Sequence, residues 1–161
     1  QEVGFLFVGI FLTMVPALGY LATNAASLGL ESPTQYYYFT GALSAVLDNA
    51  PTYLNFMQSA LGVLHLPLDS DGIHRFIANT YDVIHSDGSA VHFEGKILLE
   101  AISLAAVFFG AMTYIGNGPN FMVKSISEAS GVEMPSFFAY LGYACLILLP
   151  ILLVIWAIFI R

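Results

Sequence analysis

The segment Gly41-Ala-Leu-Ser-Ala-Val-Leu-Asp-Asn-Ala-Pro-Thr-Tyr-Leu54 decides the fold, because a polar turn at 48–51 interrupts an otherwise apolar stretch over 36–63. The proline of this turn removes a backbone donor and disfavours helix at the residue before it. The arms on either side, 38–47 and 52–63, are each about 15 to 18 Å long as helices, roughly half of a membrane's hydrocarbon core. We therefore expect a re-entrant hairpin whose tip lies near the middle of a membrane.

The composition of the chain supports a membrane protein. Hydrophobic residues make up 58% of the 161 residues and charged residues only 9%, against about 25% charged residues in soluble domains. A soluble domain of this size cannot bury so much apolar surface, whereas lipid removes the need to bury it. The net charge of −7 argues against nucleic acid as a partner, and the single cysteine, Cys145, excludes an internal disulfide.

A second apolar stretch, 97–130, is broken in the same way. Residues 98–115 are apolar and rich in small side chains, then Gly116-Asn117-Gly118-Pro119 interrupts them, and a short helix resumes at Asn120. The glycines permit unusual backbone angles and the proline enforces the stop. This stretch is predicted to be a discontinuous transmembrane helix.

Two further stretches lack such polar breaks and are predicted to span the membrane. They run over 3–22 and 135–160, and each is long enough to cross roughly 30 Å of hydrocarbon. Pro135 suits the start of a helix, and Trp156 and Arg161 suit an anchor at the membrane interface.

The connector 64–96 is polar and is predicted to be a loop outside the membrane. Within it, residues 73–84 fit an amphipathic helix that lies at the interface. The tyrosines at 36–38, before the connector, are predicted to form an interfacial aromatic belt. All the histidines of the chain fall in the connector without the spacing of a metal site: His65, His74, His85 and His92.

The residues at the two breaks could bind an ion. Helices that break at membrane depth free carbonyls for a cation and N–H groups for an anion. Asp48 adds a carboxylate, which costs roughly 2.5–3.5 kcal/mol at the centre of a spanning helix and therefore needs a proton, a cation or an ion-pair partner. Side-chain oxygens suit Na⁺, so Asp48, Asn49 and Asn117 are the candidate sodium ligands, with Thr52 beside them. In a soluble chain the same sequence would be an ordinary turn.

These segments resemble a known group of proteins. The segment 41–54 resembles the hairpin motif of the ion transporter superfamily, which includes sodium/proton antiporters, arsenite efflux permeases and citrate or dicarboxylate transporters. The segment Gly110-Ala-Met-Thr-Tyr-Ile-Gly-Asn-Gly-Pro-Asn-Phe-Met-Val123 resembles the second broken helix of the same superfamily. The most similar branch is that of sodium/proton antiporters or citrate transport proteins, and the resemblance covers nearly the whole chain.

The resemblance implies an all-α membrane protein that forms the C-terminal inverted repeat of a secondary transporter. It further implies a missing N-terminal repeat as a partner and assembly as a homodimer. Asn49 and Thr52 match the residues at the hairpin tip, and Asp48 stands where carboxylate transporters have a serine, which resembles the antiporter pattern. The implied ion- or substrate-binding residues are Asp48, Asn49, Thr52, Gly116, Asn117, Gly118 and Asn120, with Pro51 and Pro119 as the breaks.

Together these features predict a secondary active ion transporter, a multi-pass protein of the cell inner membrane that contacts the lipid bilayer and uses no cofactor. The favoured activity is exchange of Na⁺ for H⁺, with Asp48 alternating between a proton and the cation. The first alternative is Na⁺-coupled transport of citrate or another dicarboxylate, bound at half-helix N-termini.

Two readings of another class remain. An intramembrane aspartyl hydrolase would need a second carboxylate close to Asp48, and Glu100, near a span's end, is the only other acid in the spans. We therefore expect no enzyme. A fragment or assembly subunit without transport activity stays open.

Cysteines placed at Gln35 and Leu66 are expected to react with a membrane-impermeant thiol reagent from the same side of the membrane, because a re-entrant hairpin returns to the face that it left. The measurement is labelling of single-cysteine variants in sealed vesicles of both orientations, with Cys145 replaced by alanine. Labelling from opposite sides would turn the segment into an ordinary span.

Overall fold

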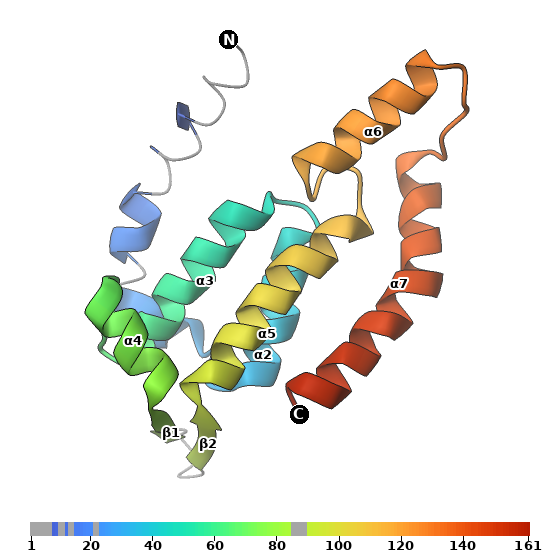
Figure 1. The fold of residues 1–161 in the computed structure, drawn as a ribbon. Helices are drawn as coiled ribbons and strands as arrows, with labels where there is room; N and C mark the ends of the chain where they lie inside the picture. Colours follow the sequence, from blue (N-terminus) through green and yellow to red (C-terminus); the bar gives the residue numbers. More distant parts are fainter. Residues whose placement is uncertain (1–7, 10–11, 13–14, 21–22, 85–89) are drawn as a thin grey trace.

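The computed structural model describes residues 8–9, 12, 15–20, 23–84 and 90–161. Its elements are, in order, η1 (Ala25–Leu28), α2 (Pro33–Ser44), α3 (Asn49–Val63), α4 (Ser70–Ala78), β1 (Thr80–Ile84), β2 (Ala90–Glu94), α5 (Gly95–Phe108), η2 (Phe109–Met112), α6 (Gly118–Ala129) and α7 (Phe137–Phe159). Figure 1 shows α2, α3 and α5 side by side as a bundle, with α6 and α7 on one flank.

The helices α2 and α3 form a helix-turn-helix hairpin joined by residues 45–48. A capping box starts α2, because Ser32 Oγ accepts from the Gln35 N–H while the Gln35 side chain accepts from the Ser32 N–H. This cap makes α2 begin at Pro33, earlier than the predicted stretch from 36. At the other end, α3 ends at Val63. His65 follows with a positive φ of 54°, and Leu66 N–H donates to Leu61 O at 2.8 Å.

Both breaks lie N-terminal to the positions predicted from the sequence. The hairpin turn covers 45–48 and not 48–51, and the non-helical part of the second break covers 113–117 and not 116–119. In each case the proline, Pro51 or Pro119, lies in the first turn of the helix that follows. A first-turn N–H has no partner within the helix, so proline costs little there.

The expected interfacial belt at 36–38 is wrong for its first two members. Tyr36 is 2% exposed and Tyr37 is fully buried. The Tyr37 hydroxyl donates to the carbonyl of Leu152 at 2.9 Å and so ties α2 to α7. A tyrosine ring fills a core well when its hydroxyl finds such a partner.

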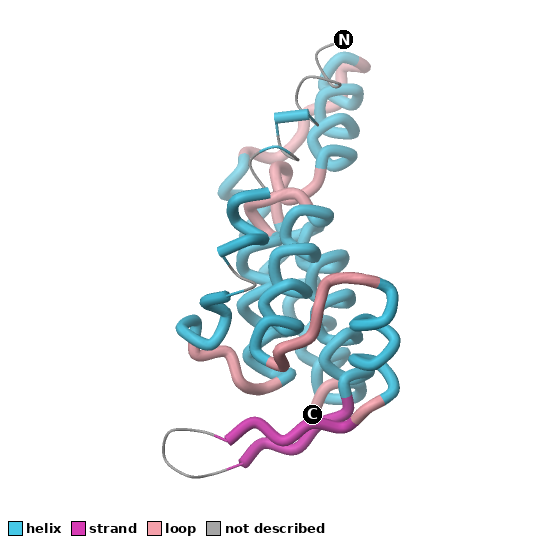
Figure 2. The backbone as a smooth tube through the Cα atoms, turned by 90° about the vertical axis from the view of Figure 1, so that its left-hand side faces the viewer, coloured by secondary structure: helices cyan, strands magenta, loops and turns pink. Residues whose placement is uncertain are grey.

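The connector is more ordered than the predicted loop. Asp69 caps α4 by accepting from the Gly72 N–H at 2.7 Å. The predicted helix 73–84 is correct only to Ala78, because Asn79 is extended and ends α4. The chain then forms an antiparallel hairpin, with register from Thr80↔Glu94 to Ile84↔Ala90, which projects from one end of the helical bundle in Figure 2. The described residues are mostly helical, and the expectation of an all-α fold is wrong only for this β-hairpin.

Two helical segments in the described part of the chain are long and apolar enough to cross a membrane, Gly95–Met112 and Phe137–Phe159. The second of these, α7, contains Pro150 and begins after the N-cap Ser136, so Pro135 precedes the helix that it was expected to open. The predicted span 3–22 falls largely outside the described residues.

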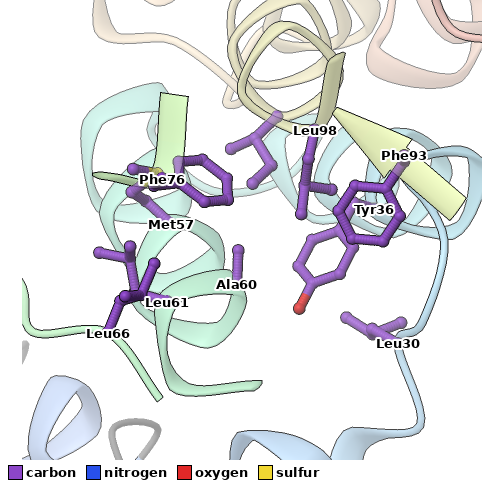
Figure 3. Packing of buried hydrophobic residues seen from close by; sticks show 10 residues of the cluster. Leu30, Tyr36, Met57, Ala60, Leu61, Leu66, Phe76, Phe93 and Leu98 are labelled. Atoms are coloured by element: carbon purple, nitrogen blue, oxygen red, sulfur yellow. The ribbon is translucent and has the colours of Figure 1, made fainter. Parts of the chain in front are cut away.

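Two apolar clusters hold the bundle together. Figure 3 shows the first, in which the α2–α3 hairpin, α4, β2 and α5 meet. The second joins α2, α5 and η2 to α7 around Tyr37 and Phe109, whose rings meet edge to face at 5.4 Å. The members of the first cluster are Leu30, Tyr36, Met57, Ala60, Leu61, Leu66, Phe76, Phe93, Leu98 and Ile102.

Gly95→Ala is expected to lower the thermal midpoint in detergent by several degrees. A Cβ at Gly95 would overlap the carbonyl oxygen of Phe76 and press on the Tyr81 ring, and overpacking against backbone costs ~1–3 kcal/mol. Gly142→Ala is the matched control, because no described atom lies within 4 Å of its Cβ position. Alanine favours the helix there by up to about 1 kcal/mol, so this variant should be equally or more stable. An unchanged midpoint for Gly95→Ala would refute the close packing of α5 on α4.

Candidate functional site at the two helix breaks

The two helix breaks lie against each other, and the side chain of Asn49 joins them. With its amide nitrogen directed at the neighbouring carbonyls, Asn49 donates to Gly116 O at 3.1 Å and to Ala106 O at 2.9 Å. Its amide oxygen then accepts from Asn117 Nδ2 at 3.0 Å. In this orientation every polar end of the amide faces a complementary partner. The structure therefore brings together Asn49, Gly116 and Asn117, which the sequence placed at separate breaks.

Ser44, at the end of α2, adds a second link to the same carbonyl. It is fully buried, its hydroxyl donates to Ala106 O, and its Oγ lies 3.0 Å from the Asn49 amide nitrogen. Ser44 and Asn49 therefore attach both arms of the hairpin to one point on α5.

Thr113 performs the corresponding role from the second break. Its hydroxyl donates to the carbonyl of Ala45, the C-cap of α2, and accepts from the N–H groups of Ile115 at 3.2 Å and Gly116 at 3.0 Å. One side chain thus satisfies an unpaired carbonyl at the hairpin tip and two unpaired donors of the break.

Two glycines permit this close approach of backbones. A Cβ on Gly116 would lie 2.7 Å from each of three carbonyl oxygens, those of Ser44, Ala45 and Gly110. Carbon and oxygen normally pack about 3.5 Å apart or more. A Cβ on Gly110 would overlap the side-chain amide of Asn49. Only glycine fits at either position.

Asn120 completes the second break from the first turn of α6. Its Nδ2 donates to Gly110 O at 2.9 Å and to Thr113 O at 3.2 Å. The amide therefore reaches back across the break to carbonyls at its N-terminal side, and this fixes the start of α6 relative to η2.

The other predicted site residues lie outside this network. Thr52 is 1% exposed, and its hydroxyl donates to Asp48 O at 2.9 Å within the first turn of α3. Asp48 is the half-buried N-cap of α3, and its carboxylate makes no cap hydrogen bond and no ion pair with any described residue. Gly118 is exposed, with no described atom within 4 Å of its Cβ position.

The contact between the two breaks, around Asn49, Gly116 and Asn117, is called the helix junction below. The orientation of the helices gives this junction one side of positive and one side of negative electrostatic potential. The N-termini of α3 and α6 meet at the Asn49–Asn117 contact, and neither N-cap side chain, Asp48 or Asn117, bonds an N–H of its own helix. Helix N-termini carry partial positive charge and attract anions. The C-terminal carbonyls of α2 and η2 crowd around Gly116 on the other side, and such carbonyls attract cations.

Tyrosines hold the second break against α7. The rings of Tyr114 and Tyr140 stack at 4.2 Å, Tyr114 Oη donates to Pro135 O at 3.1 Å, and Tyr140 Oη donates to Ala111 O at 3.0 Å. The Lys124 ammonium lies 5.5 Å from the centre of the Tyr114 ring, so α6 is tied to the same pair.

Three residues of the junction are not among those that the sequence predicts: Ser44, Gly110 and Thr113. By residue type alone, Ser44 fits a helix serine that bonds its own backbone, and Thr113 fits a residue that packs between helices. The available signal was position, because each lies within a turn of the start of a break, where freed backbone groups need partners.

Interrupted helices whose freed backbone groups pair inside an apolar bundle are typical of secondary transporters, in which such breaks form the binding site. A family model described as "Putative citrate transport" matches residues 1–160, and the chain belongs to this transporter family. Comparisons with curated proteins and with solved structures found no match.

Gly116→Ala is expected to reduce transport by the full-length protein by about tenfold or more, because a displacement costing ~1–3 kcal/mol falls on the backbone of the site. Gly118→Ala, two residues away, should retain the parental rate, since its Cβ meets no described atom. Both are measured as initial uptake in proteoliposomes at matched protein content. Equal rates for the two variants would contradict the close approach at Gly116.

Proposed function

We propose that the chain is part of a secondary active transporter that carries citrate or a similar di- or tricarboxylate together with Na⁺. The observation that supports this most is the meeting of two uncapped helix N-termini at the Asn49–Asn117 contact. A carboxylate placed there would accept hydrogen bonds from the first-turn N–H groups of α3 and α6 and would gain from both helix dipoles. The family description agrees with such a substrate.

The cation would bind on the carbonyl side of the same junction. The oxygens of Ser44, Ala45 and Gly110 converge on Gly116, and the Asn49 and Asn117 side chains are adjacent to it. A small rotation of these carbonyls would give a cation several oxygen ligands without a carboxylate from the protein. Opposite charges bound a few ångströms apart attract each other strongly in a water-poor site, which is a physical reason for coupling the two.

Exchange of Na⁺ for H⁺ is a second candidate, favoured by Asp48. This carboxylate is half-buried at the hairpin tip and makes no ion pair with any described residue, so it is available to bind a cation or a proton. It also stands at the positive end of α3, where a bound substrate anion would compete with it.

Asp48→Asn separates the two candidates in proteoliposomes of the full-length protein. If the protein transports a carboxylate, the variant should keep Na⁺-driven uptake of radiolabelled citrate, with an equal or lower KM, because a negative charge beside the anion has been removed. If the protein is an antiporter, the variant should lose Na⁺-driven proton movement, measured with an internal pH-sensitive dye.

Asp71→Asn is the matched control, since the Asp71 side chain is 78% exposed on α4 and far along the chain from both breaks. It should change neither measurement. Citrate uptake by the parent protein that is absent, or that proceeds equally without Na⁺, would contradict the proposed function.

A further inference from the structure

A row of buried polar side chains runs along the α2–α3 hairpin beside its apolar cluster. Ser44, Thr40 and Tyr36 follow one another at intervals of one helical turn on α2, and each is 2% exposed or less. Thr52 and Ser59 of α3 are each 1% exposed. We call this row of side chains the hairpin seam. Buried polar groups normally have hydrogen-bond partners, so each polar group of the seam is expected to have one.

Two hydrogen-bonded pairs fix the register of the seam. Near the tip the Asn49 amide nitrogen donates to Ser44 Oγ at 3.0 Å, and near the base the hydroxyls of Tyr36 and Ser59 are 3.3 Å apart. One turn, about 6 Å, separates Tyr36 from Thr40, and the same rise separates Ser59 from Asn55 on the antiparallel arm. Thr40 and Asn55 therefore lie at the same level, between the two pairs.

At that level the seam contains side-chain oxygens that lack hydrogen-bond partners within the described ranges of the chain. Thr40 Oγ1 and Asn55 Oδ1 are both buried, and neither has a hydrogen-bond partner among the described residues. No other buried side-chain oxygen or nitrogen in the described part of the chain lacks one. An unpaired buried polar group costs about 1–3 kcal/mol, so two at one level mark a place where a further partner binds.

Space for such a partner adjoins the seam. A cavity of about 350 Å³ is lined by Asn55 and Ser59 together with apolar side chains. Its apolar wall consists of Ala17, Tyr20, Leu28, Leu43 and Phe56. A water molecule needs only a small part of this volume, but it does need polar partners, and Asn55 and Ser59 are the seam residues that line the cavity.

We propose that the hairpin seam is a hydrated binding site, in which a small ligand bridges Thr40 Oγ1 and Asn55 Oδ1. This ligand is water, which donates hydrogen bonds to the two oxygens, or a hydrated Na⁺ ion. The ligand donates to, or coordinates, both oxygens and extends the row of polar contacts from the Tyr36–Ser59 pair to the Ser44–Asn49 pair. The seam thereby connects the base of the hairpin to its tip by polar groups alone. This site is separate from the helix junction and does not depend on which substrate is transported.

Thiol labelling tests the hydration of the seam, because alkylthiosulfonate reagents react with a thiolate in water and hardly at all in a dry core. In a Cys145→Ala background, Thr40→Cys should react with 2-aminoethyl methanethiosulfonate at least tenfold faster than Ala60→Cys. Ala60 is the matched control, because it lies on the same hairpin with 1% exposure but belongs to the apolar cluster of Figure 3. Equal, slow labelling of both variants would overturn the proposal.

Repeating the labelling with Na⁺ and with choline identifies the ligand. A severalfold slower reaction of Thr40→Cys in Na⁺ indicates the cation, and an unchanged fast reaction indicates water. Both results support the site, because both ligands satisfy the same two oxygens.

The stability of Thr40→Val gives an independent test. Valine keeps the shape of threonine and removes the hydroxyl. If the hydroxyl binds a ligand, the thermal midpoint of the variant should stay equal or fall, and if the seam is dry, removing an unpaired buried group should raise it. A raised midpoint would therefore overturn the proposal even where cysteine variants fail to fold.

Discussion

The structure depends on the mutual satisfaction of two broken helices. Each break frees backbone carbonyls and N–H groups that an apolar environment cannot solvate, and each such group left unpaired costs free energy. Asn49 and Ser44 serve carbonyls of the second broken helix, while Thr113 serves a carbonyl of the hairpin. Neither break could be satisfied alone inside an apolar bundle, so the position of the hairpin tip and that of the second break determine each other. The tyrosine contacts to α7 and the packing of α2 on α5 follow from this arrangement.

Much of the helical organisation could be predicted because its cause is local. Proline and polar residues inside an apolar run are rare enough to identify both breaks, although proline's tolerance for a first turn shifted each break toward the N-terminus. The β-hairpin of the connector was missed, because Thr80–Ile84 alternates too briefly to be distinguished from a loop and because its partner strand follows an intervening segment. The burial of Tyr36 and Tyr37 depends on partners in α3 and α7 that are distant along the chain, and no local pattern reveals them.

The candidate site, like the fold, could be predicted only in part from the sequence. Asn49, Gly116, Asn117 and Asn120 could be identified because they are the polar and flexible residues at the breaks, and the structure gathers them into one network. Residue type could not show which way a side chain points. Thr52 turns back onto its own helix, while Ser44 and Thr113, which resemble ordinary helix residues, reach across to the other break. Only the three-dimensional packing distinguishes Gly116 from Gly118, although both belong to one four-residue motif.

The unequal lengths of the two apolar helical segments have a consequence for the surrounding lipid. Gly95–Met112 contains 18 residues and α7 contains 23, so their apolar lengths are about 27 and 34 Å. A bilayer that matches the first is too thin for the second unless α7 tilts, and each ångström of hydrophobic mismatch costs a fraction of a kcal/mol. The Tyr37–Leu152 hydrogen bond joins α7 to the hairpin arm that leads to the tip. Because of this bond, a change in the tilt of α7 with acyl-chain length is expected to shift the hairpin arm as well.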